Sequence, residues 1–213
     1  MTRGKFITLE GIEGAGKSTV ATVLSDALRS RGIAVRQTRE PGGTPLAERL
    51  RQLVLQRSDE SLSAEAETLL MFAARAIHLD NLVRPALERG EWVICDRFTD
   101  ATRAYQGGGR GVDSGLIEQL AGSVHQGLEP DLTLLLDLPV TIGLERARSR
   151  RQANGESVTD RFESETVQFF ERVRASYLEI AHRDARRCQI IDASKDRDAV
   201  RSAALVALQE LWR

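Results

Sequence analysis

A segment near the start of the chain has the residue types and spacing of a phosphate-binding loop. It reads Gly11-Ile12-Glu13-Gly14-Ala15-Gly16-Lys17-Ser18 and matches G-x-x-x-x-G-K-[ST] at every required position. Glycines let backbone N–H groups converge on phosphate oxygens, and the N-terminus of a following helix adds partial positive charge. Lys17 is placed to reach the β- and γ-phosphates of a nucleoside triphosphate, and the Ser18 hydroxyl to bind Mg²⁺. We therefore predict a nucleoside triphosphate site here.

A second candidate site residue ends an apolar run. Trp92-Val93-Ile94-Cys95-Asp96 is typical of a buried strand followed by an acid, and Asp96 is suited to hold Mg²⁺ directly or through water. A motor ATPase would need another acid beside it to position the attacking water, but the next residue is Arg97. A cation there favours binding of a second phosphate, with an ordinary strand-end ion pair as the alternative.

Further arginines favour chemistry between two phosphates. Arg39 follows the second predicted strand, and in a parallel sheet that end faces the same crevice as the phosphate loop. We expect Arg39 and Arg97 to clamp an acceptor phosphate. Four arginines in six residues then precede a polar stretch, Gln152–Thr159: Arg146, Arg148, Arg150 and Arg151. They either offset the dipole of a helix end or belong to a loop that closes over ATP. Phosphoryl transfer to a dianion needs such charge stabilisation more than it needs a base.

These residues are positioned by alternating strand and helix patterns. Short runs rich in Ile, Leu and Val predict parallel strands covered on both faces, at Lys5–Glu10, Ile33–Thr38, Trp92–Asp96, Leu132–Asp137 and Cys188–Ile191. The pattern predicts helices at Ser18–Arg31, Pro45–Leu55, Glu65–Arg89, Asp113–Gln126, Val140–Arg151, Glu163–Arg183 and Asp196–Trp212. We expect one α/β domain over residues 1–213, an open five-stranded parallel sheet with helices on both faces. The strand order stays open, and Gln106–Gly111 and Gln152–Thr159 are expected to be mobile loops beside the site.

Composition excludes several classes of protein. Thirty Lys and Arg against 31 Asp and Glu leave a net charge of −1, which disfavours nucleic acid as a partner. No apolar run reaches the ~18–20 residues of a membrane span, and the first residues lack the apolar core of a signal peptide. Cys95 and Cys188 lie in apolar strand-like runs and are expected to be buried free thiols. We expect a cytoplasmic protein.

The chain resembles the thymidylate kinases in a series of short segments that occur in the family's order. They are spread over most of the chain, at Glu10–Thr19, Thr38–Thr44, Leu70–Arg75, Asp96–Phe98, Ala104–Gly111, Asp160–Glu163 and Ile191–Ala193. The resemblance implies a P-loop fold like that of nucleoside monophosphate kinases. It also implies that ATP, with Mg²⁺, gives its γ-phosphate to dTMP to form dTDP and ADP for dTTP synthesis. The ATP loop would then extend from Gly11 to Thr19.

The resemblance also implies roles for acceptor-site residues. Phe72 would stack on thymine, Arg75 would donate to a thymine carbonyl, and Gln106 would meet the pyrimidine edge; core packing is the alternative for Phe72. Tyr105 would lie against the sugar 2′ position. Glu10 would contact the 3′-hydroxyl or the metal shell.

This phosphate loop has no cation except Lys17, so the sequence resembles the bacterial members that carry catalytic arginines in a lid. We expect the lid at about 148–162 and favour Arg148 and Arg151 as catalytic residues beside Lys17 and Arg97, with Arg150 not separable from them. The family implies a homodimer packed through helices, for which Leu69, Met71 and Ile77 are a candidate stripe. Another monophosphate or deoxynucleoside kinase is the nearest alternative. A nucleotide-dependent switch is disfavoured because no Asn-Lys-x-Asp guanine signature follows the later strands.

Overall fold

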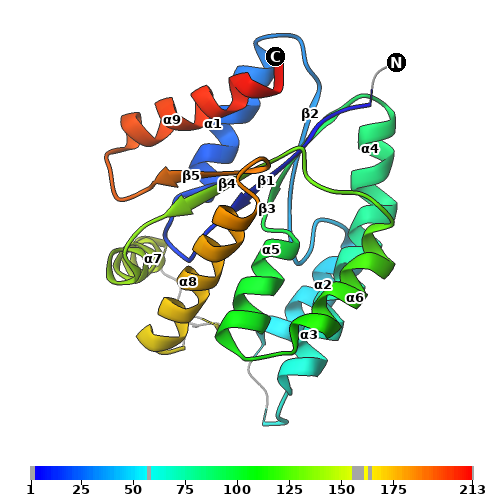
Figure 1. Cartoon of the computed structure of the whole chain (residues 1–213), viewed down its shortest axis with the longest axis vertical. Coiled ribbons are helices and arrows are strands. Elements are labelled where there is room, and N and C mark those ends of the chain that lie inside the picture. Colours follow the sequence, from blue (N-terminus) through cyan, green and yellow to red (C-terminus); the bar gives the residue numbers. More distant parts are fainter. Residues whose placement is uncertain (1–2, 57–58, 155–160, 163–164, 213) are drawn as a thin grey trace.

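The computed structural model describes residues 3–56, 59–154, 161–162 and 165–212, and its centre is a five-stranded parallel sheet (Figure 1). The strands are β1 (Phe6–Glu10), β2 (Val35–Arg39), β3 (Trp92–Asp96), β4 (Leu132–Asp137) and β5 (Cys188–Asp192), in the order β2-β3-β1-β4-β5. The predicted parallel sheet is therefore confirmed. Because the chain moves first to one side of β1 and then to the other, a crevice opens at the carboxyl ends of these central strands.

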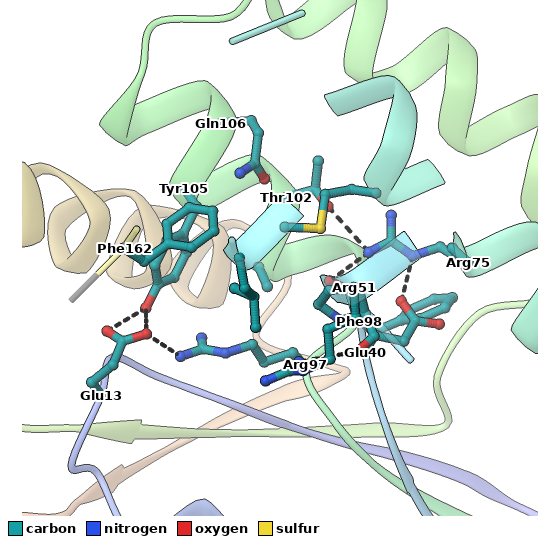
Figure 2. Close-up of a pocket in the computed structure, with 14 residues that line it drawn as sticks. Glu13, Glu40, Arg51, Arg75, Arg97, Phe98, Thr102, Tyr105, Gln106 and Phe162 are labelled. Atoms are coloured by element: carbon teal, nitrogen blue, oxygen red, sulfur yellow. Dashed lines mark hydrogen bonds and ion pairs between the residues drawn. The ribbon is translucent and has the colours of Figure 1, made fainter. Parts of the chain in front are cut away.

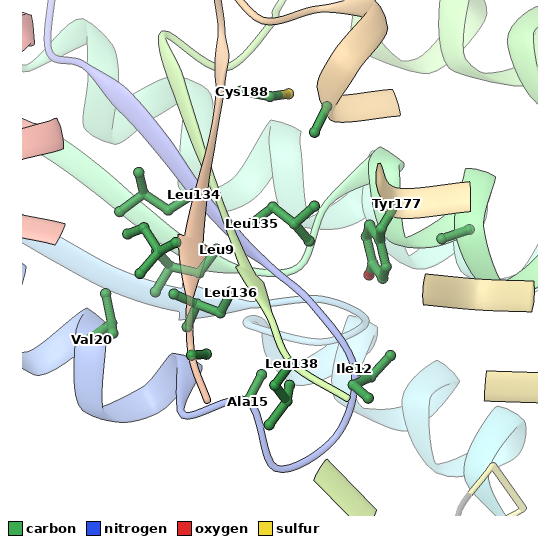
Figure 3. Close-up of a cluster of buried hydrophobic side chains, with 14 of the residues drawn as sticks. Leu9, Ile12, Ala15, Val20, Leu134, Leu135, Leu136, Leu138, Tyr177 and Cys188 are labelled. Carbon is green, nitrogen blue, oxygen red and sulfur yellow. The ribbon is translucent and has the colours of Figure 1, made fainter. Parts of the chain in front are cut away.

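The core lies on both faces of β1 and β4, which are buried almost throughout. Successive side chains of β4 alternate: Leu134 and Leu136 lie toward Val20 of the first helix, whereas Leu135 lies toward Tyr177 (Figure 3). Both faces need apolar residues, which explains the continuous apolar runs in the sequence. β2 and β5 differ from the prediction, because they are edge strands with exposed residues rather than strands covered on both faces.

Helices cover both faces of the sheet. α1 (Lys17–Arg29) and α9 (Arg197–Gln209) pack together on one face, and α8 (Val167–Arg183) packs with other helices against the opposite face (Figure 1). Side chains of N-cap residues accept a backbone N–H and so define several helix starts: Thr44, Ser63, Asp113, Thr166 and Asp196. These starts belong to α2 (Pro45–Leu55), α3 (Ala64–His78), α6 (Ser114–His125), α8 and α9. The last turn, Glu210–Trp212, is a 3₁₀-helix.

The helix predicted over Glu65–Arg89 is not continuous. It consists of α3, a π-helical turn η1 at Leu79–Val83, and the short α4 at Arg84–Glu88. Pro85 has no N–H to donate to the preceding turn, and a widened turn accommodates the lost hydrogen bond. α3 is the part that reaches the crevice.

The prediction of a loop over Gln106–Gly111 is wrong for most of that segment. After a short helix α5 (Thr99–Thr102), the chain forms a π-helical segment η2 at Arg103–Gly109. η2 packs so closely on α8 that a Cβ on Gly108 would lie 2.6 Å from the Cβ of Ser176. The glycines therefore permit close helix packing rather than flexibility, and that packing holds Tyr105 and Gln106 beside the crevice.

The other predicted loop begins later than expected. α7 runs from Val140 to Asn154, so it contains the start of Gln152–Thr159, and residues 155–160 lie outside the described part of the chain. α8 begins at Val167, later than the predicted Glu163, which also lies outside it. Among the described helices, none is both long and apolar enough to cross a membrane.

Candidate active site

The phosphate loop connects β1 to α1 at the crevice, as its strand–loop–helix pattern predicts. Lys17 is buried, and its Nζ donates to the carbonyl oxygens of Gly11 (3.0 Å) and Ile12 (3.2 Å). Burial, followed by the nearby charge of Arg97, lowers the pKa of Lys17. Ser18 and Thr19 begin α1 with exposed side chains. The loop thus presents backbone N–H groups, a lysine and a hydroxyl on one edge of the sheet.

Asp96 ends β3 beside this loop. Its Oδ1 is buried, lies 3.9 Å from Lys17 Nζ and, within the described residues, accepts no hydrogen bond. A buried carboxylate oxygen without a donor is suited to a hard cation, and a carboxylate with a serine hydroxyl is the oxygen donor set that Mg²⁺ prefers. Asp96 and Ser18 therefore fit the predicted metal site.

Arg97 lies between the phosphate loop and a cavity. It adopts the left-handed backbone conformation (φ 71°), which is unusual for a residue other than glycine. Its guanidinium donates to the Gly11 carbonyl (2.9 Å), the Tyr177 hydroxyl (3.1 Å) and Glu13 Oε1 (2.8 Å). This half-buried side chain thus lies at the junction of the loop and the cavity.

The cavity next to Arg97 encloses about 560 Å³, part of it open to solvent (Figure 2). It is lined by residues from the phosphate loop, the β2–α2 connection, α2, α3, the segment after β3, and one residue that precedes α8. They are Glu13, Glu40, Pro41, Arg51, Leu55, Met71, Arg75, Arg97, Phe98, Ala101, Thr102, Tyr105, Gln106 and Phe162. Apolar walls with a few converging polar groups are typical of a site for a small organic ligand.

Arg75 is the principal cation at one end of the cavity. Its Nε donates to Glu40 Oε2 (2.6 Å), and its Nη2 donates to the Phe98 carbonyl and the Thr102 hydroxyl (both 3.1 Å; Figure 2). Burial alone would raise the pKa of Glu40, but the charge of Arg75 and hydrogen bonds from His78 and Arg75 hold it below its usual range. Nη1 of Arg75 is buried without a hydrogen-bond partner in the described part of the chain. That donor is available to a ligand.

Glu13 and Tyr105 form the side of the cavity nearest the phosphate loop. The Tyr105 hydroxyl donates to both carboxylate oxygens of Glu13, at 2.9 and 2.8 Å. Burial raises the pKa of Tyr105 well above its usual value, so the phenol stays protonated as a donor. Gln106 lines the wall beside it, with its amide nitrogen donating to the buried Glu67 at 2.6 Å.

Three residues assigned to the acceptor site lie elsewhere. Glu10 is buried and accepts hydrogen bonds from the Phe98 backbone N–H and the Tyr177 hydroxyl, and burial next to Asp100 raises its pKa to about 8. Phe72 packs in a core cluster with Val112, Ile117 and Ala121. Arg39 is exposed and ion-paired with Glu48 at 3.1 Å. None of the three lines the cavity, because β1 directs Glu10 into the core, Phe72 packs in its cluster, and Arg39 ends the edge strand β2.

Sequence reasoning missed several residues that line the cavity, chiefly Glu40, Arg51 and Met71. Met71 takes the position expected of Phe72, its neighbour on α3. Arg51 of α2 donates to the Pro41 carbonyl (3.0 Å) and brings a further cation to the cavity. The signal for Glu40 was present in the segment Thr38–Thr44, but nothing in the sequence indicated its partner.

The arginines expected in the lid lie on α7, next to the same region. Arg148 and Arg151 of α7 line a second hollow together with Glu13, which also lines the cavity. Arg150 is exposed and does not line either hollow. Of the expected lid at 148–162, residues 155–160 lie outside the described part of the chain.

A phosphate loop, an acid on the neighbouring strand and a cation-lined cavity for a second ligand define a P-loop kinase acting on a small acceptor. Comparison with known proteins identifies the branch. The model of the thymidylate kinase family matches residues 9–204, so this chain belongs to that family.

Thymidylate kinases of known sequence or structure are similar to this chain over nearly its whole length. The chain is 52% identical to the thymidylate kinase of Nitrosomonas eutropha over 212 residues, covering all of this chain and 95% of that protein. It is 54% identical to that of Pseudomonas syringae pv. syringae over 213 residues, covering 99% of each. The crystal structure of thymidylate kinase from Ehrlichia chaffeensis matches with a TM-score of 0.76 and 34% identity, covering 97% of this chain and 99% of that one.

Proposed function

We propose that this protein transfers the γ-phosphate of ATP to dTMP, giving dTDP and ADP for dTTP synthesis. The observation that carries the proposal is the cavity beside the phosphate loop, with Arg97 at the junction and Arg75, whose buried Nη1 has no partner among the described residues, in its lining. The acceptor phosphate would lie at Arg97 and its base near Arg75. Membership of the thymidylate kinase family supports this choice of acceptor.

At the acceptor end, the donors favour a pyrimidine with carbonyl groups. Arg75 has donors only, so its free N–H suits a thymine carbonyl oxygen, and Gln106 offers a carbonyl oxygen and an N–H to the pyrimidine edge. Met71 supplies an apolar, polarisable surface for the ring in place of Phe72. Tyr105 and Glu13 lie on the sugar side, where Glu13 takes the contact first assigned to Glu10.

At the donor end, the loop from Gly11 to Thr19 holds the triphosphate of ATP, and Ser18 and Asp96 hold Mg²⁺. When bound, Mg²⁺ neutralises charge on the β- and γ-phosphates. Lys17 stabilises the transferring group, and Arg97 holds the acceptor phosphate in line with it. Arg148 and Arg151 add positive charge from the lid side across the hollow shared with Glu13.

The direct test is a coupled ADP-release assay with Mg-ATP and a panel of monophosphates. Purified protein receives dTMP, dUMP, ribo-TMP, dCMP, AMP or GMP at equal concentration. We expect strong preference for dTMP. Strong turnover of another monophosphate would support a kinase but refute dTMP as its acceptor. ATP hydrolysis that no monophosphate stimulates would favour a nucleotide-dependent switch.

Replacing Arg75 with alanine is expected to raise the KM for dTMP by roughly 10- to 100-fold, because a hydrogen bond from a charged group contributes about 1.5–3 kcal/mol. The KM for ATP should stay within about twofold, since Arg75 lies in the acceptor cavity. Steady-state kinetics with each substrate varied in turn measures both. An unchanged KM for dTMP would show that the pocket assignment is wrong.

We also infer a homodimer and a cytoplasmic location. Leu46 and Leu53 of α2 and Leu69 of α3 are about 49–59% exposed and form a candidate helical interface. Met71, from the predicted stripe, lines the cavity instead. Size-exclusion chromatography with light scattering should give twice the 23.6 kDa chain mass, and a monomer would contradict the inference. Two buried free thiols, Cys95 and Cys188, fit a reducing compartment.

A further inference from the structure

A buried row of hydrogen bonds extends from Thr38 through His78 and Glu40 to Arg75 in the lining of the acceptor cavity. Thr38 Oγ1 lies 2.7 Å from His78 Nε2, His78 Nδ1 lies 2.9 Å from Glu40 Oε1, and Glu40 Oε2 accepts from Arg75 Nε at 2.6 Å. His78 is completely buried, and Glu40 and Arg75 are 3% exposed. Glu40 and Arg75 line the cavity, whereas His78 and Thr38 do not. Among the described residues, the hydrogen bond to Glu40 is what joins His78 to the cavity lining.

For a neutral His78 ring, the donors and acceptors in this row have one consistent arrangement. Glu40 is held ionised beside Arg75, so both of its oxygens are acceptors and His78 Nδ1 must donate to it. In the neutral ring, Nε2 is then an acceptor and the Thr38 hydroxyl donates to it. Each oxygen of Glu40 thus has its own donor. A carboxylate otherwise turns freely about its last torsion, so two donors from different sides define its plane.

The backbone is shaped around the imidazole. Gly43 has a φ of +84°, and a Cβ on it would lie 2.4 Å from Thr38 Oγ1 and 2.6 Å from His78 Cδ2 and Nε2. Thr38, Glu40 and Gly43 all belong to the segment Thr38–Thr44, which the sequence singled out for a phosphate clamp. In the structure, three of its residues enclose or contact His78 instead.

We propose that His78 is a positioning residue that holds the Glu40 carboxylate in the plane that aims Arg75 at the acceptor base. The proposal rests on the proposed function, and it adds a determinant of acceptor choice. A guanidinium only donates, so a well-aimed Arg75 favours a carbonyl at C4 of a pyrimidine, as in dTMP, over the amino group of dCMP. If Glu40 turns, Arg75 loses one of the three hydrogen bonds that orient it, and this discrimination weakens.

The test compares His78→Leu, which removes both hydrogen bonds, with His78→Gln, which keeps a donor for Glu40. We expect His78→Leu to raise the KM for dTMP about tenfold, to leave the KM for ATP within about twofold, and to lower the dTMP-to-dCMP ratio of kcat/KM about tenfold. His78→Gln should restore most of that ratio. Thr38→Val should give a smaller change in the same direction, and Thr8→Val is its matched control, because Thr8 makes a buried hydrogen bond to Thr133 outside the row.

A purely structural role for His78 predicts a different pattern. The proposal is wrong if folded His78→Leu keeps the wild-type dTMP KM and dTMP-to-dCMP ratio. It is equally wrong if His78→Leu and Thr8→Val change both substrates' KM in proportion to a lower Tm. If His78→Leu does not fold, His78→Gln and Thr38→Val decide the question. A dTMP-to-dCMP ratio of kcat/KM that is unchanged in both variants would refute the positioning role of His78. Wild-type protein that does not prefer dTMP would refute the proposed function separately.

Discussion

Lys17→Ala is expected to lower kcat for dTMP phosphorylation by about 10²- to 10³-fold, the loss typical when one preorganised electrostatic contact to a transition state is removed. Nζ lies within hydrogen-bond distance of the Gly11 and Ile12 carbonyls and 3.9 Å from Asp96, so its charge is held over the phosphate loop. The Lys17 ammonium is already in place before the reaction. It therefore stabilises the negative charge on the transferring phosphoryl group in the transition state. Single-turnover transfer from ATP measures the chemical step.

The comparison that interprets this result is ATP binding by the same variant. Backbone N–H groups of the loop remain, so binding of a fluorescent ATP analogue should weaken far less than transfer does. Thermal unfolding checks that the variant folds, since Lys17 is buried. A variant with near wild-type turnover would remove Lys17 from the catalytic assignment.

Arg148→Ala or Arg151→Ala is expected to lower kcat by about 10³-fold or more with little change in either KM, as for arginines that act on the transferring phosphoryl group. Both residues line the hollow that includes Glu13, next to the cavity and the phosphate loop. The effect should fall on kcat because the charge is needed most when the phosphoryl group lies between donor and acceptor.

Arg150→Ala is the matched control for the lid. It removes the same charge from the same helix, but Arg150, unlike Arg148 and Arg151, does not line the hollow. We expect Arg150→Ala to lower kcat by less than tenfold. A larger loss for this variant than for the other two would move the catalytic role to Arg150, and a change confined to the KM for ATP would reassign the lid arginines to ground-state binding.

The differences between the residues expected in the acceptor site and those that line the cavity have a common physical origin. Phe72 and Met71 are neighbours on a helix, where each residue turns about 100°, and α3 is apolar on more than one side. Phe72 therefore faces the cluster with Val112 and Ile117, while Met71 faces the cavity. Glu10 and Glu13 also face different surroundings. Glu10 is the last residue of the buried strand β1, whereas Glu13 lies in the phosphate loop and lines the cavity.

The sequence by itself determined the parts whose geometry is local. The phosphate loop is a run of consecutive residues between a strand and a helix, so its pattern specifies the triphosphate site and the place of Lys17. Apolar runs alternating with helices likewise predicted the parallel sheet, because strands covered on both faces must be apolar throughout. Family membership, predicted from ordered segments, was confirmed over residues 9–204.

Only the tertiary structure decided which distant residues meet. Arg75 of α3, Glu40 after β2, Arg51 of α2 and Thr102 of α5 converge because the strand order and helix rotations bring their segments to one edge of the sheet. The glycine-rich run became the helix η2 because α8 packs against it. Such pairings depend on packing between elements far apart in the chain, which the local residue pattern does not specify.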